Sequence, residues 1–227
     1  VPSVNLLSPA QNTRTTNTSF GFKYIPDDNS GELLNCSLII NNNVNTTNHT
    51  IIPGVQNNIS VSGFTNGEYD WTVNCTDPSG NTGTTEPYTL IVDLTGPSID
   101  LIWPEESDIY NYDDLNFTWN ATDTWATNLY CNLSIDDTVN VTNIATTSGE
   151  ITNKTVYDVA KGYHNWSIFC WDDLNNTATT GVVNFTVNSP DLTLNNTHII
   201  NDHTNPDENK TLRINATIYN IGGSTAY

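Results

Sequence analysis

The 227-residue sequence predicts an all-β protein made of tandem β-sandwich domains, and three observations lead to this prediction. Short runs of alternating apolar and polar residues recur along the chain, as in half-buried strands, and turn-forming residues separate them. No segment has a convincing helical period. The chain also repeats itself at a spacing of 95 residues. Seven short strands in each repeat are typical of a β-sandwich.

The first repeat shows how these strands are placed along the chain. Strands are expected at 4–7, 19–24, 33–40, 50–52, 58–62, 68–75 and 88–92. Turns are expected at 26–31, 53–54, 66–67 and 77–83, where proline, glycine, asparagine and aspartate gather.

The repeat also sets the expected domain boundaries. A shift of 95 residues needs no gap, and its best stretch places 67–77 over 162–172. Domains are therefore expected at 1–93 and 97–188, joined by short linkers at 93–96 and 188–189 that each adjoin a proline. From Pro190 the register is lost, and residues 190–227 are expected to form a partial third β-sandwich.

Four cysteines follow the same repeat. They are Cys36, Cys75, Cys131 and Cys170, and each repeat separates its two cysteines by 39 residues. None has the C-x₂-C spacing of a zinc site or a redox dithiol. The spacing predicts two disulfides, Cys36–Cys75 and Cys131–Cys170, in an oxidising extracellular setting, and four buried free thiols are the alternative.

The chain resembles a known family at these residues. YDWTVNCTDPSGN at 69–81, followed by a strand and TGP at 95–97, resembles tandem immunoglobulin-like repeats of bacterial and archaeal cell-surface proteins, over residues 1–188. Antibody-type domains differ, because their tryptophan lies on an earlier strand. PDLTL at 190–194 and TLRINATIYNIGG at 211–223 resemble the opening of CARDB, a cell-adhesion-related β-sandwich domain of prokaryotic surface proteins.

Seventeen Asn-x-Ser/Thr triplets occur, roughly twice the number that the composition predicts by chance. Their acceptors are Asn17, Asn35, Asn45, Asn48, Asn58, Asn74, Asn116, Asn120, Asn132, Asn140, Asn153, Asn165, Asn175, Asn184, Asn195, Asn209 and Asn215. In ten of them the middle residue is apolar, so strand alternation by itself produces part of the excess. We expect N-linked glycans at many of these sites, and a purely compositional origin is the alternative.

Composition and charge exclude several classes of partner. The formal net charge is −19 and the pI is near 4.1, so the surface repels nucleic acid and anionic membranes. No apolar run approaches the 18 residues of a membrane span, so no membrane insertion is expected within this segment. Any leader or anchor is expected to lie outside the sequence.

Catalytic motifs are absent from the sequence, so no catalytic residue is assigned and the chain is predicted not to be an enzyme. His198 and His203 flank Asp202, a weak metal-binding pattern, and no metal ligand is assigned. Lys23 is the one lysine in an early strand, the place of an isopeptide-forming lysine, but its phase is ambiguous.

Acidic residues raise the question of calcium. Clustered loop carboxylates between sandwich domains can bind Ca²⁺, but we favour a solvated acidic surface and expect no cofactor other than glycans. Asp77 and Asp172 are the best single candidates, because each follows the second cysteine of its repeat. The alternative for both is a hydrogen bond to the turn that follows.

The function expected from these observations is structural. We expect a segment of a heavily N-glycosylated extracellular filament, stalk or surface coat, whose partners are other copies of itself. Strand donation to the incomplete third domain is one way in which such copies would polymerise. The alternative is a cell-surface adhesin that binds glycans or another surface protein through Trp125 or Trp171, the two tryptophans outside the core phase. A more remote alternative is an accessory domain of a larger periplasmic enzyme.

Overall fold

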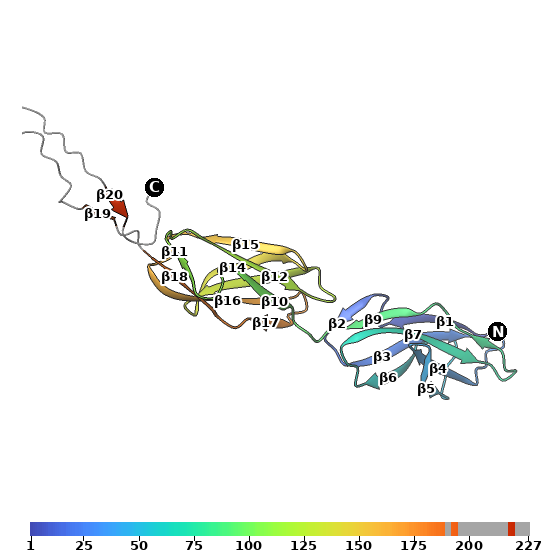
Figure 1. Ribbon diagram of the computed structural model, residues 1–227. Helices are drawn as coiled ribbons and strands as arrows, with labels where there is room; N and C mark the ends of the chain where they lie inside the picture. Colours follow the sequence, from blue (N-terminus) through green and yellow to red (C-terminus); the bar gives the residue numbers. More distant parts are fainter. Residues whose placement is uncertain (189–191, 195–217, 221–227) are drawn as a thin grey trace, which may run out of the picture. The chain divides into compact units, whose positions relative to one another are not determined.

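The computed structural model describes residues 1–188, 192–194 and 218–220 (Figure 1). By its internal contacts the chain divides into two compact units, Val1–Thr95 and Gly96–Tyr227. Every regular element in the described ranges is a β-strand. Accordingly, those ranges contain no helix of the length and apolarity that a membrane crossing requires.

The first unit contains nine strands in two sheets (Figure 1). They are β1 (Ser3–Ser8), β2 (Thr13–Thr15), β3 (Ser19–Asp27), β4 (Asn35–Ile40), β5 (Asn43–Asn48), β6 (Asn57–Ser62), β7 (Gly67–Thr76), β8 (Thr82–Gly83) and β9 (Tyr88–Val92). One sheet has the order β1-β3-β6, and the other has the order β2-β9-β7-β4-β5 with β8 on β7. All neighbours are antiparallel except β2 and β9.

The second unit repeats this arrangement strand for strand. Its strands are β10 (Ser98–Trp103), β11 (Asp108–Tyr110), β12 (Leu115–Thr122), β13 (Asn128–Ile135), β14 (Thr138–Thr147), β15 (Ile151–Val156), β16 (Gly162–Trp171), β17 (Thr177–Thr179) and β18 (Val183–Val187). The sheets have the orders β10-β12-β15 and β11-β18-β16-β13-β14, with β17 on β16. Two facing, mainly antiparallel sheets in this order form an immunoglobulin-like sandwich, so the predicted all-β fold class is confirmed.

Each sandwich has its own aromatic core, placed by strand alternation. Trp71 on β7 and Trp166 on β16 are fully buried. Phe22 meets Trp71 edge to face at 4.9 Å between ring centroids, and Phe117 meets Trp166 in the same way at 5.2 Å. The prediction that Trp71 and Cys75 on β7, and Trp166 and Cys170 on β16, face the core is confirmed.

The two predicted disulfides are also confirmed. Cys36–Cys75 joins β4 to β7, and Cys131–Cys170 joins β13 to β16, with Cα–Cα distances of 4.0 and 4.1 Å. In both pairs the cysteines lie directly opposite each other on neighbouring strands of one sheet. Antibody domains instead join the two sheets with their disulfide.

The expected strand at 50–52 is wrong, and a hairpin that the alternation did not reveal replaces it. β4 and β5 are joined by Asn41 and Asn42, whose φ angles are 49° and 64°. Asp136 and Asp137 join β13 to β14 with φ angles of 50° and 57°. Left-handed pairs of this kind form the two-residue turn that matches the twist of a hairpin, and Asn and Asp tolerate it.

Residues 50–52 lie in a loop, and the buried side chain of Asn57 takes both backbone hydrogen bonds of Ile52. The Asn57 side chain accepts from the N–H of Ile52 at 3.1 Å and donates to its carbonyl oxygen at 2.8 Å. Asn57 also donates to the carbonyl oxygen of Val55 at 2.9 Å. The side-chain amide therefore takes the place of a neighbouring strand.

Two short strands of the second unit lie beyond its sandwich. They are β19 (Leu192–Leu194) and β20 (Ile218–Asn220), which pair antiparallel. The rest of the expected partial third sandwich, including most of the CARDB-like segment, lies outside the described residues.

Candidate functional site

Most of the described glycan acceptors lie on the solvent side of their strands, and Asn17 and Asn175 lie in loops. Fourteen of the seventeen belong to the described residues, and none of those fourteen asparagines is buried. The apolar middle residues point the other way, and eight of them are buried: Cys36, Ile59, Cys75, Phe117, Ala121, Leu133, Trp166 and Phe185. Asn57, the one buried asparagine in the described ranges, is not part of a triplet. Alternation thus turns the acceptor side chains on strands away from the core, although the Oδ1 atoms of Asn74 and Asn120 are covered.

Three aromatic side chains, two of them exposed and the third, Trp171, half-buried, gather on the outer face of the larger sheet in the second unit. Tyr130 on β13 stacks against Trp171 on β16 at 6.1 Å between ring centroids, with an interplanar angle of 27°. Phe169 lies 5.8 Å from Trp171 on the same strand. Tyr130 is 37% exposed and Phe169 39% exposed. These three residues are called the aromatic platform below.

Sequence reasoning found only one member of this platform. Trp171 was singled out because it is out of phase with the buried Trp166, and the structure places it on the outer face. Tyr130 and Phe169 were missed, although both alternate with the buried cysteine next to them. Trp125, the other singled-out tryptophan, lies in the β12–β13 loop. Its backbone N–H donates a hydrogen bond of 2.8 Å to Oδ1 of Asp123.

An acceptor asparagine completes the platform. Asn132 lies directly opposite Phe169, as Tyr130 lies opposite Trp171, so the four side chains occupy the corners of a rectangle. The Asn132 Oδ1 accepts a hydrogen bond from the N–H of Asn143 on β14 at 2.9 Å. Asn143 has a φ of 55° at an irregularity of the β13–β14 register.

The same rectangle in the first unit contains no aromatic residue. Its corners are Asn35 opposite Thr76, and Ser37 opposite Asn74. The two units share strand order and register here, so the difference lies in side chains alone. The platform is therefore a property of the second unit and not of the fold.

The two candidate aspartates hold turns. Asp77 Oδ1 accepts from the N–H groups of Ser79 and Asn81 at 2.9 Å, and Oδ2 accepts from Asn81 Nδ2 at 2.8 Å. In the second unit, Asp172 Oδ1 accepts from the N–H of Leu174 at 2.9 Å, and Asp172 Oδ2 accepts from Asn176 Nδ2 at 2.9 Å. The Asn81 side-chain bond is the largest cause that holds the pKa of Asp77 below its ordinary value.

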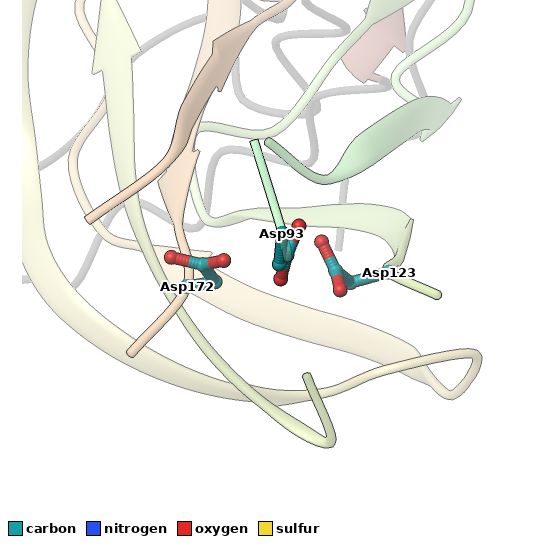
Figure 2. Close-up of side chains that lie close together, drawn as sticks. All are labelled: Asp93, Asp123 and Asp172. Carbon is teal, nitrogen blue, oxygen red and sulfur yellow. The ribbon is translucent and has the colours of Figure 1, made fainter. Parts of the chain in front are cut away.

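Asp172 also has an acidic neighbour within its own unit. Carboxylate oxygens of Asp123 and Asp172 lie within 4.8 Å of each other (Figure 2). Asp123 Oδ1 accepts from the N–H of Ala126 at 2.7 Å, so this carboxylate too is committed to a turn. Asp93, which Figure 2 also labels, is a residue of the first unit, where its Oδ2 lies 3.5 Å from Nε of Arg14. Calcium binding stays a prediction that we do not favour.

His164 has a structural role, and Lys23 is not placed for an isopeptide bond. Buried His164 places Nδ1 2.7 Å from Asp136 and Nε2 2.6 Å from the carbonyl oxygen of Ala160, so it ties the β13–β14 turn to the chain before β16. Lys23 is exposed on β3, whereas an isopeptide bond needs a buried lysine. His198 and His203 lie outside the described residues.

Comparisons with known proteins find similar solved structures but no similar sequence family. A scan against protein-family models and a search of curated proteins find no match. Solved structures that match include the fibronectin(III)-like modules of Clostridium thermocellum CbhA, with 15% identity, a TM-score of 0.38, and coverage of 82% of this chain and 94% of that one. The FN1–FN3 domains of chicken CNTN1 match with 11% identity, a TM-score of 0.40, and coverage of 86% and 70%.

A third match is the tandem Ig repeats of Dlar. It has 13% identity, a TM-score of 0.31, and coverage of 83% of this chain and 98% of that one. These three structures are modules of immunoglobulin or fibronectin type.

Proposed function

We propose that this chain is a structural segment of an N-glycosylated extracellular filament, stalk or surface coat. The observation that carries the proposal is the placement of the fourteen described acceptor asparagines, none of which is buried, on sandwich surfaces with few charges. Two disulfide-bonded sandwiches in tandem provide stable spacer modules, and disulfides persist in oxidising compartments.

The glycans would serve as the solvating layer of this surface. Only 14% of the residues are charged, so solvation depends on amides and hydroxyls. Glycans add bulk and polar groups at the strand faces and would shield the backbone from proteases. Such a coat suits a protein that stays outside the cell.

The test is glycopeptide mass spectrometry of the protein isolated from its native surface, combined with electron cryomicroscopy of that material. Occupied acceptors in both units, and regular assemblies with density on those asparagines, are expected. Bare asparagines throughout would contradict the glycosylated part of the proposal, and dispersed single chains would contradict the assembly part.

Assembly through strand donation is the finer form of this proposal. It rests on the loss of the repeat register at Pro190, after which the sequence resembles a further β-sandwich domain whose strands would pair with those of a second copy. A chain that stays monomeric at high concentration, with proteolysis confined to residues 190–227, would contradict strand donation but not the structural role.

A second candidate function is that of a glycan-binding adhesin, and the aromatic platform is the observation that favours it. Exposed aromatic rings in a cluster are typical of surfaces that bind sugars or proteins. Binding on a glycan array that is lost in Trp171→Ala would support the adhesin, and an array without signal would exclude it for the glycans tested.

A further inference from the structure

We propose that Asn132 carries an N-glycan whose first sugar packs on the aromatic platform of Tyr130, Phe169 and Trp171. This inference rests on the proposed glycosylation and deepens it, because it assigns an occupant to one exposed surface. The occupant is a sugar attached to this chain, not a soluble ligand.

The position of the acceptor within the platform is the first argument. Asn132 is the fourth corner of the rectangle whose other corners are the three aromatic residues. Side chains directly opposite on neighbouring strands have Cβ atoms about 5 Å apart, and residues two apart on one strand lie about 7 Å apart. A single pyranose ring linked to Asn132 spans these distances.

The hydrogen bond of Asn132 is the second argument, because it sets the direction of the glycan. Oδ1 accepts from the N–H of Asn143 on β14, and β13 lies between β14 and β16 in the sheet. The amide therefore turns its oxygen towards β14. Its nitrogen Nδ2, the atom to which a glycan is attached, therefore points away from β14, and β16 with Phe169 and Trp171 lies on that other side of β13.

The chemistry of the two surfaces is the third argument. One face of a pyranose ring consists of C–H groups that carry a slight positive charge, and the face of an aromatic ring is negative. Stacking them buries apolar surface on both sides. Two exposed rings and the half-buried ring of Trp171 would be covered by a group that the chain itself supplies.

The direct test is NMR spectroscopy of the glycosylated protein. Ring protons of the sugar on Asn132 are expected to shift upfield, because they lie over aromatic rings. The sugar on Asn74 is the internal control, because it lies on the same rectangle of the first unit without aromatic neighbours. An Asn132 sugar with the same shifts as the Asn74 sugar would overturn the inference without any variant.

A stability cycle gives an independent test. Ser134→Ala removes the acceptor triplet but keeps Asn132 and its bond to Asn143. It is expected to lower the unfolding midpoint of the second unit by about 4 °C. Thr76→Ala, which removes the Asn74 triplet, is the matched control and is expected to leave the first unit unchanged.

The platform variant closes the cycle. Tyr130→Gln, Phe169→Thr and Trp171→Thr together remove the rings without creating a triplet, whereas serine or threonine at 130 would make Asn128 an acceptor. In this background Ser134→Ala is expected to cause no further loss. An equal loss with and without the rings would overturn the inference.

The outcomes separate this inference from the proposed function. Glycans at other acceptors but none at Asn132 would overturn the inference and leave the proposed function intact. Bare asparagines throughout would overturn both. A free oligosaccharide that binds the platform of the glycosylated protein would overturn the inference in favour of the adhesin.

Discussion

The indole Nε1 of Trp166 donates a hydrogen bond of 3.1 Å to the carbonyl oxygen of Pro104 inside the second sandwich. Trp71 fills the same place in the first sandwich, but its Nε1 is buried without a hydrogen-bond partner among the described residues. The repeat therefore conserves the position of the ring but not its polar contact.

This difference predicts unequal effects of the same substitution. Trp166→Phe breaks a buried hydrogen bond and leaves the Pro104 carbonyl without its donor, so it should cost about 1–3 kcal/mol more than Trp71→Phe. Amide hydrogen exchange, followed separately for the core strands of each unit, measures both effects. Equal losses in the two units would contradict the prediction.

Removal of one disulfide should weaken its own sandwich. The double variant Cys131→Ala/Cys170→Ala releases a loop of about 40 residues and should cost about 4 kcal/mol in the chain-entropy estimate. Guanidinium unfolding, monitored by hydrogen exchange of β13 and β16, measures the loss in the free energy of unfolding of the second sandwich. The first unit, with its own disulfide intact, is the control and should retain its midpoint.

Asp77 should contribute to the stability of the first unit in a pH-dependent way. Folding lowers its pKa below the ordinary value of 3.8, chiefly through the Asn81 side chain, so the ionised carboxylate favours the folded state. The contribution is present above pH 3.8 and is lost as the pH falls through the lower folded pKa.

Asp77→Asn is the matched substitution, and proline at 78 prevents it from creating a glycan acceptor. It should lower the stability of the first unit at neutral pH. It should also make that stability depend less on pH between about pH 5 and pH 2. Thermal unfolding over that range measures both. An unchanged acid slope would show that Asp77 does not act through its charge.

Gly96 should not tolerate even a methyl group. A Cβ at this position would lie 2.2 Å from the carbonyl oxygen of Thr177, a backbone atom of the same unit. Gly96→Ala should therefore cost about 1–3 kcal/mol through strain. Gly181→Ala is the control, because a Cβ there meets nothing within 4 Å, and it should be neutral or slightly stabilising. Similar midpoints for the two variants would contradict this account.

The strand faces follow from the sequence because they depend on local geometry. Trp71, Val73 and Cys75 alternate with polar residues, and a period of two places them on one face of any strand. The shortest strands and the β4–β5 hairpin were missed, because the Asn-Asn pair at 41–42 is a turn signal only in the left-handed conformation that the hairpin twist demands.

The sequence by itself determined the all-β class, the 95-residue repeat, the cysteine pairs and the solvent-facing acceptor asparagines. Only the tertiary structure decided which of those asparagines lies beside aromatic residues. Phe169 lies opposite Asn132, 37 residues earlier in the chain, because β13 and β16 pair in one register. That register is set by the disulfide between Cys131 and Cys170 and by the apolar residues that both strands bury. A shift of one residue would turn every such side chain to the other face, so the platform depends on long-range pairing that no local pattern encodes.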